Sequence, residues 1–144
     1  MISTSGSESP HETRGLYSMR PEQFDAIYAV GHLLFQAEDF VRAADVFRFL
    51  LLAEPDRTGT WLALGACHER LDEHDLAGAL YETGFRIDNQ AVELGLLAAR
   101  ARARTGDRQR ARELLDDVAH SDPPEQTRIK ARNIQTLLAA GEGP

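Results

Sequence analysis

The fold of this chain is decided by residues 60–89, which read TWLALGACHERLDEHDLAGALYETGFRIDN. The first half of this stretch holds a glycine after a short apolar run, and the second half holds an alanine among further apolar residues. Both small positions recur once before and once after the stretch, always at the same interval in the numbering. The two series are Gly31, Gly65 and Ala99, and Ala43, Ala77 and Ala111. Three copies in register indicate a repeated structural unit of about 34 residues.

Two further positions follow the same spacing. A bulky apolar residue stands four residues after each alanine (Phe47, Tyr81 and Leu115), and the units close on Pro55, Asn89 and Pro123. This pattern resembles the tetratricopeptide repeat (TPR), a helical hairpin that buries its apolar face only by stacking on neighbouring hairpins. We therefore predict an all-α fold, with three TPR hairpins in a short right-handed superhelix and a C-terminal capping helix.

The repeat positions divide the chain into a central domain and two ends. We expect a TPR domain at residues 20–140. Residues 1–19 offer few apolar side chains for a core and are predicted to be disordered until a partner binds, and residues 141–144 form a tail. Within the domain, the predicted repeats span about 24–57, 58–91 and 92–125, and the capping helix spans 124–140.

The capping helix is predicted from its own pattern. A polar side chain at Ser121 or Asp122 followed by two prolines is typical of a helix start, and Gly141 is expected to end the helix. Four apolar side chains are expected to pack it onto the third repeat: Ile129, Ile134, Leu137 and Leu138. Without such a cap, the apolar face of the last repeat would stay open to water.

The composition indicates the cellular setting. The first twenty residues lack the apolar core of a signal peptide. The single cysteine, Cys67, excludes an intramolecular disulfide and gives no sign of an oxidising compartment. We therefore expect a cytoplasmic protein.

Charge is distributed unevenly along the chain. The net charge of −7 argues against general nucleic-acid binding, because phosphates are held by rows of cations. Residues 1–91 hold 7 arginines against 15 acidic residues, whereas residues 92–144 hold 9 basic against 8 acidic residues. Arg100 and Arg104 lie four apart and share one helical face. They belong either to a solvated surface or to a site for the acidic groups of a bound peptide.

The residue types that catalysis needs are almost absent from the predicted repeats. Residues 21–120 contain no serine and no lysine, which excludes a serine nucleophile, a Schiff-base lysine and a phosphate-binding loop there. Cys67 is expected to be buried and inert, and the five histidines show no metal-site spacing. We therefore expect no enzyme, no catalytic residue, no bound metal and no cofactor.

The remaining candidate site is the concave wall of the superhelix. The TPR resemblance implies that the first helix of each hairpin lines this wall. The inward positions are Tyr28, His32, Phe35 and Gln36 in the first repeat, Leu62, Ala66, Glu69 and Arg70 in the second, and Glu93, Leu96, Arg100, Ala103 and Arg104 in the third. The large aromatics Tyr28 and Phe35 indicate pockets for the side chains of a bound peptide. Alternatively, they pack against the N-terminal segment of the same chain.

A second resemblance depends on runs that generic TPRs do not share. The specific runs are Leu64-Gly65-Ala66-Cys67 and Tyr81-x-x-Gly84-x-x-Ile87-Asp88, together with Tyr28, Leu34-Phe35-Gln36-Ala37, Phe40 and residues 43–47, 61–67 and 75–77. Over about residues 20–120 the chain is similar to the class II type III secretion chaperones of Gram-negative bacteria. Members of that family are small acidic cytoplasmic proteins of three TPRs that bind the hydrophobic translocator subunits of the injectisome before export.

The resemblance implies hydrophobic type III translocators as partners, with no nucleic acid and no membrane. An extended, proline-containing translocator segment would lie in the groove, with Tyr28, Phe35 and Phe40 at family aromatic positions and Leu62 and Ala66 on the floor. An aromatic residue is usual at the position of His32, so His32 departs from the family pattern. The resemblance also implies homodimers through the N-terminal helix. The open alternatives are another TPR adaptor, such as a needle-subunit chaperone or a secretion regulator, and an enzyme.

Overall fold

The computed structural model describes residues 18–141, which form α-helices joined by short turns. The expected disorder of residues 1–19 falls outside the described residues for positions 1–17, and the expected tail falls outside them for positions 142–144. In chain order the helices are α1 (Pro21–Gln36), α2 (Phe40–Ala53), α3 (Thr58–Arg70), α4 (His74–Ile87), α5 (Val92–Arg104), α6 (Arg108–His120) and α7 (Glu125–Ala140).

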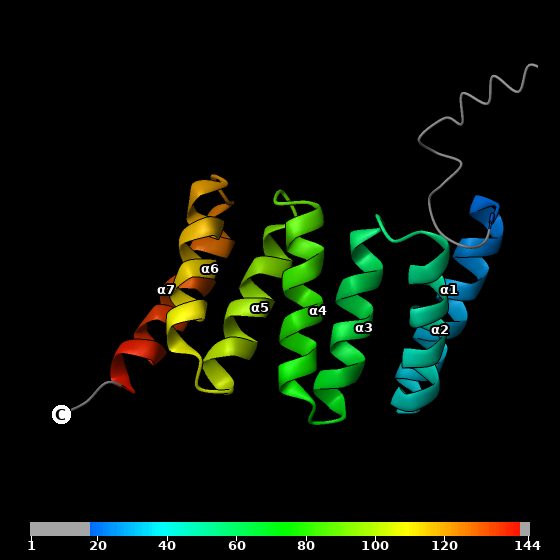
Figure 1. Ribbon diagram of the computed structural model, residues 1–144, viewed down its shortest axis with the longest axis horizontal. Coiled ribbons are helices and arrows are strands. Elements are labelled where there is room, and N and C mark those ends of the chain that lie inside the picture. Colours follow the sequence, from blue (N-terminus) through cyan, green and yellow to red (C-terminus); the bar gives the residue numbers. More distant parts are fainter. Residues whose placement is uncertain (1–17, 142–144) are drawn as a thin grey trace, which may run out of the picture.

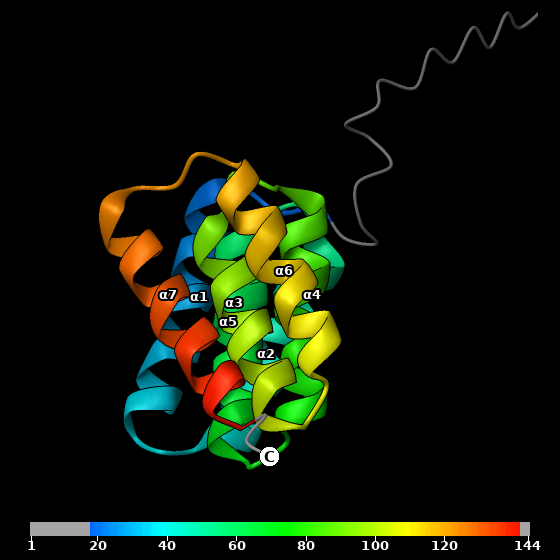
Figure 2. The ribbon, with the colours of Figure 1, turned by 90° about the vertical axis from the view of Figure 1, so that its left-hand side faces the viewer.

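The helices stack side by side along the long axis of the molecule, in the order of the sequence (Figure 1). Helices α1 and α2, α3 and α4, and α5 and α6 form hairpins, and the second helix of one hairpin packs on the first helix of the next. Helix α7 packs on both α5 and α6. Seen along the stack, α7 lies on the same side as α1, with α4 and α6 on the opposite side (Figure 2). The predicted all-α TPR fold with a C-terminal helix is confirmed.

The pairing of a small residue with a bulky one explains the repeat pattern. A Cβ atom added at Gly31 would lie 2.7 Å from the Phe47 ring, and one added at Gly65 would lie 2.3 Å from the Tyr81 ring. The two helices of each hairpin therefore approach so closely that the aromatic ring takes the space of the missing side chain. In the third repeat both positions change together, to Ala99 and the smaller Leu115, and both side chains are buried.

The turns inside the hairpins recur at the same interval as the repeats. Glu38, Asp72 and Gly106 each have a positive φ, of 60°, 63° and 90°. The left-handed backbone conformation costs a residue with a Cβ about 1–2 kcal/mol, whereas glycine adopts it freely. Only the third turn therefore carries the residue that its backbone favours.

Two substitutions at these turns are expected to change stability in opposite directions. Gly106→Ala should lower the free energy of unfolding by about 1 kcal/mol, because the new Cβ strains the left-handed backbone. Glu38→Gly should raise the free energy of unfolding by up to about 1 kcal/mol, because glycine adopts the left-handed backbone without strain. The ion pair with Arg70 that this change removes is exposed and adds little stability. Urea unfolding of both variants measures the two shifts. Shifts of the same sign would contradict the assigned turn conformation.

The capping helix differs in two ways from its prediction. Neither Ser121 nor Asp122 caps α7: the Ser121 hydroxyl donates to the carbonyl oxygens of Asn89 and Asp117, and Asp122 pairs with Arg128. Ser121 instead links the end of α6 to the turn after α4.

The apolar side chains of α7 also divide differently from the prediction. Leu138 is buried and Ile134 is half-buried, but Ile129 and Leu137 are 47% and 72% exposed. The expected packing of Ile129 and Leu137 onto the third repeat is wrong. Because α7 packs mainly on α5 and α6, a narrow stripe of its surface is enough for the cap.

No helix within residues 18–141 is both long enough and apolar enough to span a bilayer.

Candidate functional site

The first-repeat end of the concave wall is built around the buried ring of Phe47. Tyr28 and His32 of α1 approach this ring edge-on, with ring centroids 5.4 and 5.5 Å from it. The Tyr28 hydroxyl donates to the carbonyl oxygen of Gly59 at 3.4 Å, which links α1 to α3, and burial raises the pKa of Tyr28. Tyr28 therefore packs partly into the core, whereas the His32 side chain is exposed.

A second aromatic group lies where α1 turns into α2. The rings of Phe35 and Phe40 meet edge-on with centroids 5.1 Å apart. The guanidinium of Arg70, from α3, lies 4.6 Å from the Phe40 ring centroid and 5.6 Å from that of Phe35, a range in which cations are attracted to aromatic faces. Both phenylalanines are half-buried, so each keeps part of its surface available to a ligand.

The middle of the wall holds an ion pair between α3 and α5. Leu62 and Ala66 of α3 are half-buried, and on the same helix Glu69 accepts hydrogen bonds from Nη2 of Arg100 at 3.1 and 3.2 Å. Burial, reinforced by the Glu69 charge, raises the pKa of Tyr81 on α4. The Glu69 carboxylate is thus bonded within the chain by Arg100 of α5.

The two arginines that share a face of α5 differ in their partners within the chain. The guanidinium of Arg100 bonds Glu69, while 47% of the Arg100 side chain stays exposed to solvent. The side chain of Arg104 makes no ion pair or hydrogen bond with residues 18–141 and is exposed.

Two adjoining clefts of about 330 and 310 Å³ lie between α5 and α7. The residues that line one or both include every wall position assigned to the third repeat: Glu93, Leu96, Arg100, Ala103 and Arg104. Helix α7 adds Lys130, Ile134, Leu137 and Leu138. Helix α7 was not among the predicted wall elements, although these four residues stand one repeat interval after Leu96, Arg100, Ala103 and Arg104.

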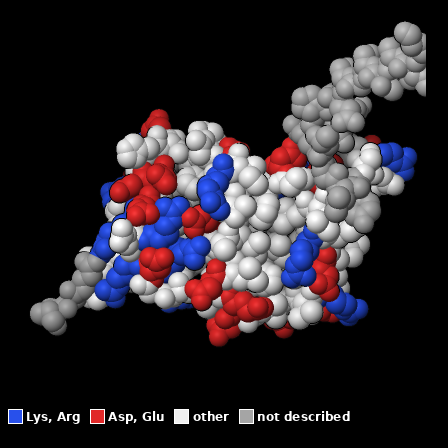
Figure 3. All heavy atoms as spheres, in the orientation of Figure 1, with Lys and Arg blue, Asp and Glu red and all other residues white. Residues whose placement is uncertain are grey.

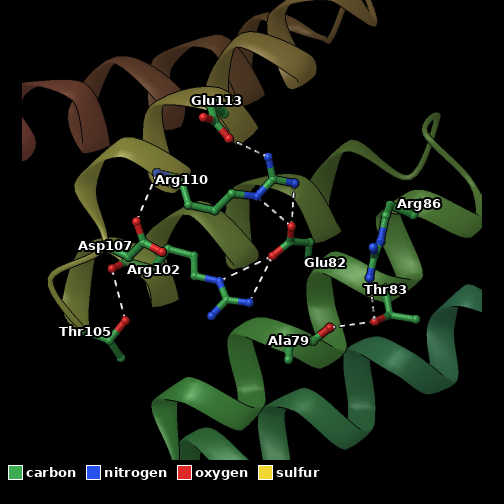
Figure 4. Close-up of polar contacts among 9 residues, drawn as sticks. All are labelled: Ala79, Glu82, Thr83, Arg86, Arg102, Thr105, Asp107, Arg110 and Glu113. Carbon is green, nitrogen blue, oxygen red and sulfur yellow. Dashed lines mark hydrogen bonds and ion pairs between the residues drawn. The ribbon is translucent and has the colours of Figure 1, made fainter.

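Helix α5 is held in place by a buried ion cluster that sequence analysis also missed. Glu82 of α4 accepts hydrogen bonds from Arg102 of α5 at 3.0 and 3.3 Å and from Nε of Arg110 of α6 at 2.6 Å (Figure 4). Burial by itself would raise the pKa of Glu82. The hydrogen bonds from Arg110 and Arg102 outweigh it, so the pKa lies below its usual value.

The same ion cluster extends to the surface. Arg110 also pairs with Glu113 one turn later on α6. Charged side chains gather over this α5–α6 end of the molecule, whereas the face over α3 and α4 is largely uncharged (Figure 3). Since the network joins residues 20 and 28 positions apart, no local sequence pattern predicts it.

Groups for metal or thiol chemistry do not gather in the described part of the chain. No cluster of three or more His, Cys, Asp or Glu side chains in residues 18–141 could hold a metal ion. The Cys67 thiol is fully buried, and burial raises its pKa to about 11. A thiol of that pKa is protonated at neutral pH and unreactive.

Comparison with known families decides which group this chain belongs to. The protein kinase G tetratricopeptide repeat family matches residues 26–139, which is well over half of the chain. The chain belongs to this family. In this TPR protein the matched region begins in α1 and ends in α7, so it includes all the wall residues described above.

Solved structures of the same fold include secretion chaperones. The translocator chaperone SycD of Yersinia enterocolitica is 22% identical with a TM-score of 0.70, and the match covers 84% of this TPR protein and 91% of SycD. PcrH from Pseudomonas aeruginosa is 23% identical with a TM-score of 0.71, and the match covers 88% and 95% of the two chains. At these identities the likeness shows a shared fold.

A plant protein is similar to part of this chain. It is a probable UDP-N-acetylglucosamine–peptide N-acetylglucosaminyltransferase SEC of Arabidopsis thaliana, 33% identical over 87 residues, or 60% of this chain. The match spans 9% of that protein's length. The likeness therefore concerns a repeat segment of a much longer protein.

Proposed function

We propose that this chain is a cytoplasmic chaperone, without enzyme activity, that binds and stabilises hydrophobic translocator proteins of a type III secretion system. Complexes with the same fold support this proposal. SycD has been solved with a peptide of the translocator YopD, and PcrH with the chaperone binding regions of PopB and PopD. The chain would hold an extended translocator segment in its concave groove.

The observation that carries the proposal is the half-buried aromatic pair Phe35 and Phe40 at the turn from α1 to α2. Burying one such side chain on binding supplies about 1.5–3 kcal/mol, so two or three anchors suffice for a micromolar complex. The groove residues that we propose to contact the client are Tyr28, His32, Phe35, Gln36, Phe40, Leu62, Ala66, Glu69, Leu96 and Arg100.

A chaperone with such a groove would keep the apolar segments of a translocator from aggregating. A translocator that later inserts into a membrane carries apolar segments, and such segments aggregate in water when they are uncovered. Enclosing one segment in a groove removes that hazard and delays its pairing with other subunits. No bond has to be made or broken, because release can follow from unfolding of the client or from competition.

We also propose a homodimer through α1. Val30 and Leu33 point outward and are 49% and 65% exposed. One repeat later, the equivalent Leu64 and Cys67 are 2% and 0% exposed, because the preceding hairpin covers them. The outer face of α1 therefore has the chemistry of a buried repeat interface, and a second copy of the chain would cover it.

Phe35→Ala is expected to weaken client binding by at least about 1.5 kcal/mol while the helix content stays unchanged. Calorimetric titration of a translocator segment and circular dichroism measure the two quantities. Phe49→Ala serves as the control, because Phe49 is 39% exposed on α2 and is not one of the wall positions. A sharp fall in melting temperature for Phe35→Ala with unchanged affinity would assign Phe35 to the core instead.

Co-expression with hydrophobic secreted proteins encoded near this chain tests the proposed function directly. Recovery of a stoichiometric translocator that is insoluble without this chain supports the chaperone. Recovery of only a soluble partner would overturn it.

The family match favours a second candidate function, a TPR adaptor for another protein. Examples are a needle-subunit chaperone and a secretion regulator. The same pull-down separates the two candidates, because an adaptor would bring down a soluble partner in place of a hydrophobic translocator.

A further inference from the structure

The groove between α5 and α7 differs in chemistry from the aromatic end of the wall. Four cationic side chains line its two clefts: Arg100, Arg104, Arg108 and Lys130. Glu93 is the acidic side chain among the lining residues. This concentration of positive charge stands in a chain whose net charge is −7.

Two of these cations have no partner among residues 18–141. The side chains of Arg104 and Lys130 make no ion pair or hydrogen bond with described residues, and both are exposed. Arg100 pairs with Glu69 but keeps 47% of its side chain exposed. Nη1 of Arg108 donates to the carbonyl oxygen of Gly141 at 2.6 Å, which ties the start of α6 to the end of α7.

Apolar surface accompanies the charge. Ile134 lies in both clefts and is half-buried, and Leu137, which lines the second cleft, is 72% exposed. Leu96 and Leu97 form the apolar part of the first cleft. Arg100 and Arg104 stand about one helical turn apart on α5, which is about 6 Å along the axis. A ligand with carboxylates at a similar spacing could meet both guanidinium groups while its aliphatic side chains contact Ile134 and Leu137.

We propose that the α5–α7 groove is a docking site for an acidic peptide segment that carries aliphatic side chains. Charge complementarity selects the acidic groups, and the clefts select the aliphatic ones. A nucleic acid fits less well, because the rest of the chain is strongly acidic and would repel a long polyanion. The proposal deepens the proposed function and shares with it the concave wall, including Leu96 and Arg100.

The test uses the full chain and a fluorescein-labelled dodecapeptide in which Glu and Leu alternate. A second peptide has Gln in place of every Glu. Fluorescence anisotropy should show binding of the Glu peptide that Arg104→Glu weakens by at least about tenfold at low salt, since one favourable charge contact becomes a repulsion. Raising the salt concentration should weaken wild-type binding, because exposed charge pairs are screened.

Arg86→Glu is the matched control for charge. Arg86 lies on α4, outside the groove, and its Nη2 is 3.5 Å from the Thr83 hydroxyl. This variant has the same change in net charge and should keep the wild-type affinity within about twofold. Circular dichroism confirms that both variants are folded. Equal loss in the two variants would show that only overall charge matters and would overturn the proposal.

Three other results would also overturn it. They are no binding of the Glu peptide, equal binding of the Gln peptide, and tighter binding of a single-stranded RNA of similar length. Phe35→Ala separates this inference from the proposed function: it should weaken a translocator segment and leave the Glu peptide unaffected. If translocator segments bind and the Glu peptide does not, only the further inference fails. If the Glu peptide binds and translocator segments do not, only the proposed function fails.

Discussion

Gly65→Ala is expected to lower the free energy of unfolding by about 2 kcal/mol. The added Cβ would lie 2.3 Å from Cε1 of Tyr81, and both residues are buried between α3 and α4. The ring cannot move away without opening the hairpin, because Tyr81 is only 1% exposed and is enclosed on all sides. Overpacking of this kind costs about 1–3 kcal/mol or more, and the better helix propensity of alanine offsets up to about 1 kcal/mol of it.

Urea unfolding followed by circular dichroism measures this loss. Gly59→Ala is the matched control, since Gly59 is also in α3 and a Cβ there would meet only the Tyr28 hydroxyl, at an ordinary 3.6 Å. We expect the control to match or slightly exceed the wild-type stability. A Gly65→Ala protein within about 0.5 kcal/mol of wild type would contradict the close approach of the two helices.

Glu82→Gln is expected to destabilise the protein by about 2 kcal/mol at neutral pH. Removing one member of a fully buried ion pair costs about 3–5 kcal/mol, because the remaining charge is left uncompensated. The loss here should be smaller, since the side chains of Arg102 and Arg110 keep 22% and 32% exposure to solvent. Thermal or urea unfolding of the variant measures it.

The difference in stability between wild type and Glu82→Gln should depend on pH in a definite direction. The pKa of Glu82 is lower in the folded state than its usual value of 4.5. The carboxylate therefore contributes stability that is fully present above pH 4.5 and is lost as the pH falls through the lowered folded value. The stability difference between wild type and Glu82→Gln should thus be largest near neutral pH and should shrink in acid.

Glu113→Gln provides the control for the ion cluster. Glu113 pairs with the same Arg110, but its side chain is 49% exposed, so we expect a loss below about 1 kcal/mol. If Glu113→Gln and Glu82→Gln cost the same amount, burial is not what makes Glu82 important. A difference between wild type and Glu82→Gln that stays constant into acid would contradict the lowered pKa.

Much of the fold could be predicted because its determinants repeat. The small residues at Gly31, Gly65 and Ala99 face the bulky ones at Phe47, Tyr81 and Leu115 within each hairpin, so their spacing in the sequence is the spacing of the contact. The prediction that α7 packs through all four of its apolar residues was wrong, because a terminal helix has neighbours on only part of its surface.

The candidate site could be predicted only in part. Position within the repeat indicated which residues face the wall, and the third-repeat positions do line the α5–α7 clefts. Position within the repeat did not indicate which side chains these wall residues would contact. Arg100 bonds Glu69 of the preceding repeat, and Arg70 lies against Phe40 of the repeat before its own. The contact of the proposed client with the groove remains a prediction.

The order, length and stacking of the helices follow from the sequence alone, because they depend on contacts at fixed spacing within and between neighbouring repeats. Which charged side chains find a partner within the chain was decided by the tertiary structure. Glu69 and Glu82 are bonded by arginines of other helices, whereas Arg104 is left without a described partner. The physical reason is that an ion pair depends on a distance of a few ångströms between side chains of different helices, and the superhelical stacking of those helices sets that distance.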